Sequence, residues 1–104
     1  MTKAMQIIIS KPARHDIRDI FFFIAVKNNR DVAHEQIVKI HKCIERLGSS
    51  PDIGAHVMHK FQINTDLRYL VSGKYIIVYR IDNTMVRVLR VIDGRRDWAR
   101  VLFL

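Results

Sequence analysis

The chain has 104 residues, of which 49% are apolar, and it carries a formal net charge of +8. This length fits one domain and leaves no room for two, and the apolar content is too high for a disordered chain. The charge requires an acidic partner or a polyanion, and nucleic acid, the ribosome, an acidic protein or an anionic membrane would each satisfy it.

The N-terminal half predicts one strand followed by two helices. Met5–Ile9 is a short β-branched run typical of a strand, and Ser10 is expected to cap a helix that ends near Lys27. Asn28–Arg30 forms a turn, after which Asp31 is expected to cap a second helix, and so short a turn favours antiparallel packing. Each helix carries a stripe of apolar side chains at steps of three and four residues. The stripes are Ala13, Ile17, Ile20, Phe21 and Ile24 in the first helix and Ala33, Ile37, Ile40, Ile44 and Leu47 in the second.

The C-terminal half predicts three strands. Asp52–Asp66 has weak periodicity and is expected to be a loop, with room for a short strand near Phe61. Short connections rich in Gly, Asn and Asp favour antiparallel hairpins between the strands that follow. Asp97–Leu104 is expected to form a short helix or a tail. The three strands are Leu67–Ser72, Tyr75–Ile81 and Met85–Ile92.

The order of the elements predicts the fold class. The order β-α-α-β-β-β describes a single α+β domain over residues 1–104, with a helical hairpin packed on one face of an antiparallel sheet. The single cysteine, Cys43, cannot form an intramolecular disulfide, which favours a reducing compartment such as the cytoplasm. Met5 is a second candidate start, in which case Met1–Ala4 would be an added leader. No signal peptide or membrane span is recognised.

Four segments resemble the RelE/ParE family of bacterial toxins at matching places along the chain. Together they span residues 7 to 97, and the fold that the resemblance implies is the one predicted from periodicity. The resemblance implies the toxin of a type II toxin–antitoxin, or plasmid stabilisation, system. The segments are Ala13 with Asp16–Ile20 (similar to "A…DL.DI"), Leu47 with Pro51–Gly54 ("L…P..G"), Leu67-Arg68 with Gly73–Arg80 ("LR…Y.I.YR") and Val88–Asp97 ("I.RVLHGRRD"). Many family members have His where this chain has Asp93.

RelE-like members of the family cleave mRNA in the ribosome without a metal. Such cleavage needs cations around the phosphate, a base for the 2′-hydroxyl and an acid for the leaving oxygen. Arg68, Arg80 and Arg90 lie on three consecutive predicted strands, and guanidinium groups suit phosphate geometry. Strand parity places Arg90 on one face with Val88 and Ile92.

The acid and base for RNA cleavage are harder to identify. Lys60, His56, His59 and Asp93 are candidates, and a lysine would need a lowered pKa to act as a base. Tyr75 and Tyr79 could stack on bases, but they share a strand face with apolar residues and are expected in the core. Under the RNase alternative the catalytic set is Lys60, Arg68, Arg80, Arg90 and Asp93.

ParE-like members instead bind DNA gyrase and trap its cleaved DNA complex. This activity needs a shaped basic surface and no catalytic group, so the lack of a convincing acid–base pair favours it. The "GRRD" ending, Gly94–Asp97, also resembles ParE. The residues expected to contact the target or a polyanion are Arg68, Arg90, Arg95 and Arg96. A basic domain that only binds RNA or DNA is a third alternative.

The family implies a cognate antitoxin as a partner. Strands with apolar residues on both faces expose more apolar surface than two helices can cover, and an acidic amphipathic segment could bury the remainder. No metal or cofactor is expected, because His34 and His41 are two helical turns apart and no compact ligand set is present. Membrane binding is disfavoured, since the apolar helix faces are needed in the core. The candidate antitoxin contacts are Phe22, Phe23, Trp98 and Phe103.

Overall fold

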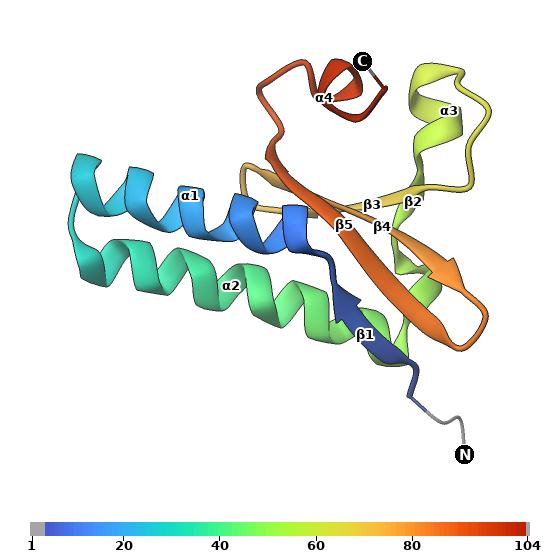
Figure 1. Cartoon of the computed structure of the whole chain (residues 1–104), viewed down its shortest axis with the longest axis horizontal. Helices are drawn as coiled ribbons and strands as arrows, with labels where there is room; N and C mark the ends of the chain where they lie inside the picture. Colours follow the sequence, from blue (N-terminus) through green and yellow to red (C-terminus); the bar gives the residue numbers. More distant parts are fainter. Residues whose placement is uncertain (1–3, 104) are drawn as a thin grey trace.

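The computed structural model describes residues 4–103 and confirms an α+β fold (Figure 1). Residues 1–3 of the leader considered above, and Leu104 of the predicted tail, lie outside this range. In chain order the elements are β1 (Gln6–Ile9), α1 (Lys11–Lys27), α2 (Arg30–Ser49), the 3-10 turn η1 (Pro51–Ile53), β2 (Ala55–His56), α3 (Val57–Phe61), β3 (Arg68–Ser72), β4 (Tyr75–Asp82), β5 (Met85–Asp93) and α4 (Trp98–Phe103).

A side chain caps the N-terminus of each helix of the hairpin. The hydroxyl of Ser10 accepts a hydrogen bond from the Ala13 backbone N–H, as predicted. At the second helix the prediction was wrong by two residues: the Asn29 side chain accepts from the Val32 N–H at 2.9 Å and is the N-cap. Asp31 lies in the first turn of α2, where a carboxylate interacts favourably with the helix dipole.

The sheet is mixed rather than fully antiparallel. Its strand order is β1-β5-β4-β3-β2, and β1 runs parallel to β5 while the other neighbours are antiparallel. The expectation of an all-antiparallel sheet is therefore wrong for β1. The physical reason is the connection: α1 and α2 carry the chain from β1 to β2 at the opposite edge of the sheet, so no tight turn joins β1 to β5 and forces that pair to be antiparallel.

A β-bulge in β5 changes which way its side chains point. Tyr79 pairs with Val88 and Val78 pairs with Arg90, so Leu89 is an extra residue in β5. Val88 consequently belongs to the core under the helical hairpin, whereas Ile92 belongs to a second core on the other side of the sheet. The prediction that Arg90 shares a face with Ile92 agrees with the register, whereas the prediction that it shares a face with Val88 is wrong, because strand parity fails across a bulge.

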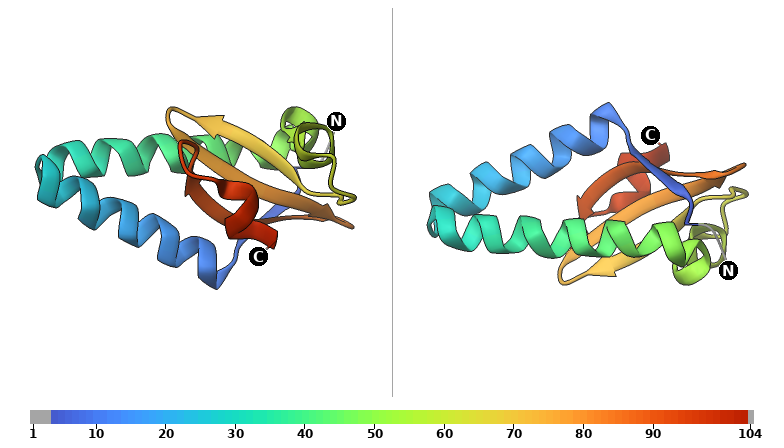
Figure 2. Two further views of the ribbon diagram at one scale, coloured as in Figure 1. Left: turned by 90° about the horizontal axis from the view of Figure 1, so that it is seen from above. Right: turned by 90° about the horizontal axis from the view of Figure 1, so that it is seen from below.

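Both faces of the sheet are covered by the chain itself. The hairpin packs on one face, where Ile40 and Leu47 of α2 join Tyr79 of β4 in the core, among others. On the other face, Val57 and Trp98 from the two short helices pack against the sheet, and Figure 2 shows α4 in front of the sheet in one view and behind it in the opposite view. The expectation that the second face needs a partner to cover it is therefore wrong. The segment Asp52–Asp66 was expected to be a loop with a possible strand near Phe61. It instead contains β2 and α3, and Phe61 is the last residue of α3.

The two tyrosines expected in the core are buried. Tyr75 and Tyr79 are 3% and 0% exposed, which confirms that they are core residues. Within residues 4–103 no helix is long and apolar enough to cross a membrane.

Candidate partner-binding cleft and the arginine positions

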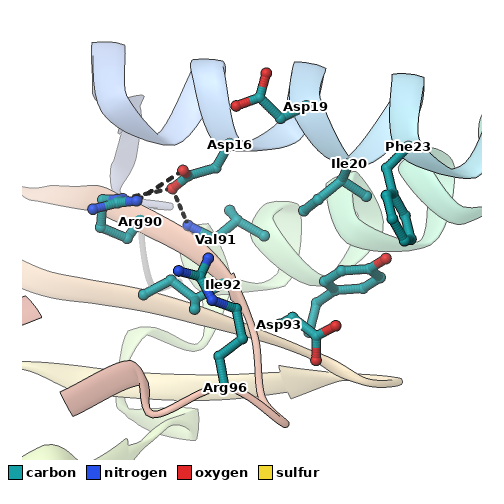
Figure 3. Close-up of a pocket in the computed structure, with 10 residues that line it drawn as sticks. Asp16, Asp19, Ile20, Phe23, Arg90, Val91, Ile92, Asp93 and Arg96 are labelled. Atoms are coloured by element: carbon teal, nitrogen blue, oxygen red, sulfur yellow. Dashed lines mark hydrogen bonds and ion pairs between the residues drawn. The ribbon is translucent and has the colours of Figure 1, made fainter. Parts of the chain in front are cut away.

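A cleft of about 390 Å³ lies between α1 and the C-terminal end of β5 (Figure 3). Its α1 wall presents carboxylates and apolar side chains, and its opposite wall comes from β5 and from the turn that follows it. Two arginines contribute positive charge, so the cleft combines an apolar floor with charged groups of both signs. The lining residues are Asp16, Asp19, Ile20, Phe23, Tyr75, Arg90, Val91, Ile92, Asp93 and Arg96.

Asp16 joins the two walls of the cleft. Its carboxylate accepts hydrogen bonds from Arg90 Nε at 2.7 Å and from the second Arg90 nitrogen at 3.0 Å, which is a bidentate ion pair. The Val91 backbone N–H also donates to Asp16, at 2.9 Å. Hydrogen bonding to Asp16 raises the pKa of Arg90, so this guanidinium is permanently charged and held on α1.

Asp93 is occupied by its neighbour Arg95. The carboxylate accepts from the Arg95 backbone N–H at 2.9 Å and from the Arg95 side chain at 3.0 and 2.7 Å. These side-chain hydrogen bonds lower the pKa of Asp93 to about 2. The side chain of Arg95 is largely exposed. Arg96 lines the cleft, and its side chain makes no hydrogen bond to any of residues 4–103.

The remaining candidate arginines lie elsewhere. Arg68 donates to the backbone carbonyls of Asp52 and Gly54 and lies 3.6 Å from the Asp52 carboxylate, so it is held at η1. Arg80 lies 3.9 Å from Asp82 near the end of β4. Arg68, Arg80 and Arg90 are therefore each paired with a different carboxylate, and of the three only Arg90 lines the cleft.

Lys60 and His59 lie on α3, and His56 is the last residue of β2, directly before that helix. The His56 and His59 rings stack with their centroids 5.0 Å apart. The Lys60 ammonium is 5.7 Å from the centre of the Phe61 ring and 6.0 Å from that of Tyr69, within the range of cation–π attraction. None of these three side chains lines the cleft.

The tyrosines have structural environments. The Tyr79 hydroxyl accepts from the Gly54 N–H at 2.9 Å and donates to the Pro51 carbonyl at 2.7 Å, which fastens η1 to the sheet. Burial raises the pKa of both Tyr75 and Tyr79. A fully buried ring cannot stack on a base in solution, so only Tyr75, through its contribution to the cleft floor, remains near a candidate site.

The predicted antitoxin contacts fall into two groups. Phe22 and Phe23 are 52% and 55% exposed on α1, and Phe103 is 37% exposed on α4. Trp98 is only 4% exposed and packs edge-on against Phe61 with ring centroids 4.6 Å apart. The expectation for Trp98 is corrected: it is a core residue of the second face, because α4 folds back onto the sheet instead of forming a free tail.

Sequence reasoning missed Asp16 as a residue of the site. It noted the residue only as part of a family segment. A usable signal was present, because Asp16, Ile20 and Phe23 are spaced by four and three residues and therefore share one helix face. The distribution of His, Cys, Asp and Glu shows no group of three or more that could hold a metal ion within residues 4–103.

The chain is similar in sequence to known toxins. A family model described as "ParE toxin of type II toxin-antitoxin system, parDE" matches residues 7–98. Toxin ParE3 of Caulobacter vibrioides is 26% identical over 97 residues, which cover 93% of this chain and 94% of that protein.

Two solved toxin–antitoxin structures contain a chain with the same fold. One is the chromosomal ParDE system from P. aeruginosa, with a TM-score of 0.75 and 16% identity over 88% of this chain and 98% of that chain. The other is the RelBE2 complex from Mycobacterium tuberculosis, with a TM-score of 0.63 and 19% identity over 86% of this chain and 98% of that chain.

Proposed function

The chain belongs to the ParE toxin family of type II toxin–antitoxin systems, and we propose that it inhibits growth by poisoning DNA gyrase in the cytoplasm. In this proposal the toxin binds gyrase through a basic surface and requires no chemistry of its own. A cognate antitoxin neutralises it.

The different ion-pair partners of the candidate catalytic arginines favour gyrase poisoning over RNA cleavage. A ribonuclease site must place several cations around one phosphorane. Here Arg68 and Arg90 are each engaged by a carboxylate, on η1 and α1 respectively. A phosphate would have to displace both ion pairs.

Asp93 is also poorly suited to proton transfer. General acid–base catalysis is most efficient when the pKa of the group is near the working pH. A carboxyl group with a pKa of about 2 is ionised at pH 7, so it has no proton to donate and is a weak base. This favours a role for Asp93 in orienting Arg95.

The surface beside the cleft supports contact with an acidic target. Arg95 is exposed, and Arg96 is not engaged by a carboxylate among the described residues. Guanidinium groups of this kind can pair with carboxylates or phosphates of a large assembly. We therefore assign target contact to Arg95 and Arg96, and a supporting, structural role to Arg68 and Arg90.

A supercoiling assay with purified gyrase, run beside a translation reaction scored for mRNA cleavage, tests the proposal. We expect loss of supercoiling, accumulation of linearised plasmid and intact mRNA. The Arg95→Gln/Arg96→Gln variant should lose most of this activity while remaining folded, with a melting temperature only a few degrees lower because the Asp93–Arg95 pair is lost. The matched control is Arg30→Gln/Arg46→Gln, which removes the same charge from exposed positions on α2.

Cleaved mRNA with normal gyrase activity would contradict the proposal and establish the RelE-like alternative. Lys60 would then be the first residue to mutate, because its stacking on Tyr69 places a cation and an aromatic ring side by side, as an RNA-cleaving site could use. Deleting α4 is not a useful test of either activity, since it would remove Trp98 from the core.

For the antitoxin we propose a docking surface on α1. Phe22 and Phe23 are exposed apolar side chains, and Arg18 and Lys27 stack on their rings at 5.8 and 5.7 Å. An acidic amphipathic segment would bury the rings and neutralise the two cations that lie over them. Phe23 also lines the cleft, so the same segment could continue toward Arg96.

A further inference from the structure

Arg80 and Arg87 form a pair of like charges on one face of the sheet. They lie directly opposite each other in the antiparallel ladder of β4 and β5. Directly opposite residues point to the same side of a sheet. Arg80 lies two residues after Val78 of the second core and shares its face, whereas Arg87 alternates with Val86 and Val88 of the hairpin-side core. Both arginines therefore face away from the helical hairpin.

This arrangement is unfavourable for the isolated protein. Like charges directly opposite each other in a sheet are destabilising. One carboxylate offsets them: the same oxygen of Asp82 lies 3.9 Å from each guanidinium. That distance is too long for a hydrogen bond, and neither guanidinium donates one to any residue within 4–103. Arg68, Arg90 and Arg95 differ, since each of them donates at least two.

The surroundings leave the pair accessible. The side chains of Arg80 and Arg87 are 44% and 34% exposed. The second core ends at Val78, so α3 and α4 do not pack over this end of the sheet. In Figure 1 the β4–β5 hairpin extends away from α1 and α2, at the right of the view. The two arginines therefore lie near the β4–β5 turn, on the sheet face away from the hairpin, with β1 pairing along the other edge of β5 at Arg87.

We propose that Arg80 and Arg87 bind the phosphodiester backbone of a nucleic acid. A phosphate oxyanion between the two guanidiniums would accept hydrogen bonds from both and remove their mutual repulsion. The pair then acts as a direct nucleic-acid contact of the toxin. The inference does not rest on the gyrase proposal. DNA and RNA duplexes both carry this backbone, and the binding experiment distinguishes them.

The test is binding of the purified chain alone to a fluorescent DNA duplex, measured by anisotropy over a series of salt concentrations. Each phosphate contact adds about one to the slope of log affinity against log salt. Arg80→Gln/Arg87→Gln should therefore lower that slope by about two and weaken binding to all sequences alike. An RNA duplex of the same sequence, measured in parallel, distinguishes the two polymers that carry this backbone.

Stability and a charge-matched control complete the test. Since the substitutions relieve a repulsion, the melting temperature of the double variant should equal or exceed that of the wild type. Arg30→Gln/Arg46→Gln should leave the slope nearly unchanged. The proposal is overturned if the control lowers the slope as much, if the Arg80/Arg87 variant binds both duplexes like the wild type, or if its melting temperature falls by several degrees. Pair-dependent DNA binding without any effect on gyrase would keep this inference and remove the gyrase proposal.

Discussion

Asp16 connects the helical hairpin to the sheet through three hydrogen bonds, two from Arg90 and one from the Val91 backbone. Its side chain is 15% exposed and that of Arg90 is 31% exposed, so the ion pair is largely shielded from water. Replacing Asp16 with Ala would leave a charged guanidinium and a backbone donor without their acceptor. We expect Asp16→Ala to lower the free energy of unfolding by about 2 to 3 kcal/mol.

The neighbouring carboxylate supplies the control for that prediction. Asp19 lines the same cleft from the same helix but is exposed and accepts no side-chain hydrogen bond within residues 4–103. Asp19→Ala gains the same helix propensity, so the difference between the two variants isolates the Asp16 contacts. Thermal unfolding should separate them by about 10 °C. Equal melting temperatures would mean that the Asp16–Arg90 pair contributes nothing to stability.

Asp93 makes the stability of the protein sensitive to acid. Its pKa in the folded chain is about 2, which is below the ordinary value of 3.8 expected when the chain unfolds. A carboxyl group with a depressed folded pKa stabilises the protein above the unfolded pKa and loses that contribution as the pH falls through the folded one. Urea unfolding should show Asp93→Asn less stable than the wild type at pH 6, by about 1 kcal/mol after allowance for solvent screening.

The pH series itself decides whether that assignment is right. The difference between wild type and Asp93→Asn should shrink as the pH falls below about 4 and vanish only below the folded pKa of about 2. A difference that is constant over this range would attribute the effect to packing and not to the charge that Arg95 stabilises.

At the scale of elements, α4 is a structural part of the domain. Trp98 packs on Phe61 and Tyr69 with ring centroids 4.6 and 5.1 Å away, and these contacts close the second core. Trp98→Ala should cost about 3 to 5 kcal/mol because it leaves a large cavity. Phe103→Ala, on the same helix but exposed, should cost less than about 1 kcal/mol. Similar chemical denaturation midpoints for the two variants would contradict this account of α4.

The elements that could be predicted from sequence are those with repeated local signals. Both long helices and the three main strands repeat an apolar pattern over several turns or alternations, and their bounds agree closely with the structure. β2 and α3 are two and five residues long, too short for any period to be read. The extra residue Leu89 is invisible to parity, since a bulge depends on pairing with β4.

The candidate site was harder to predict than the fold because its residues are distant in the sequence. Asp16 and Arg90 are 74 positions apart, and only the packing of α1 beside β5 brings them together. Arg68, Arg80 and Arg90 looked alike in sequence, since each lies on a strand. Their different partners depend on strand register, which the sequence does not specify at a bulge.

At the scale of the whole molecule, a net charge of +8 and an exposed apolar surface on α1 together define the partner that would neutralise the toxin. The charge attracts an acidic chain over a distance, and the surface made by Phe22 and Phe23 gives it a place to bury apolar side chains. Because the sheet is already covered on both faces, the antitoxin is not needed to complete the core. We therefore expect the toxin to fold on its own.

The α1 surface can be tested separately from toxicity. Phe22→Ser/Phe23→Ser changes two side chains that are more than half exposed, so the variant should fold and stay toxic when expressed alone. Coexpressed antitoxin should no longer rescue growth, because the apolar anchors of the complex are gone. Val38→Ser, at an exposed position on α2, should be rescued like the wild type. Full rescue of the double variant would remove α1 from the antitoxin interface, and loss of toxicity with retained folding would assign the two phenylalanines to the target instead.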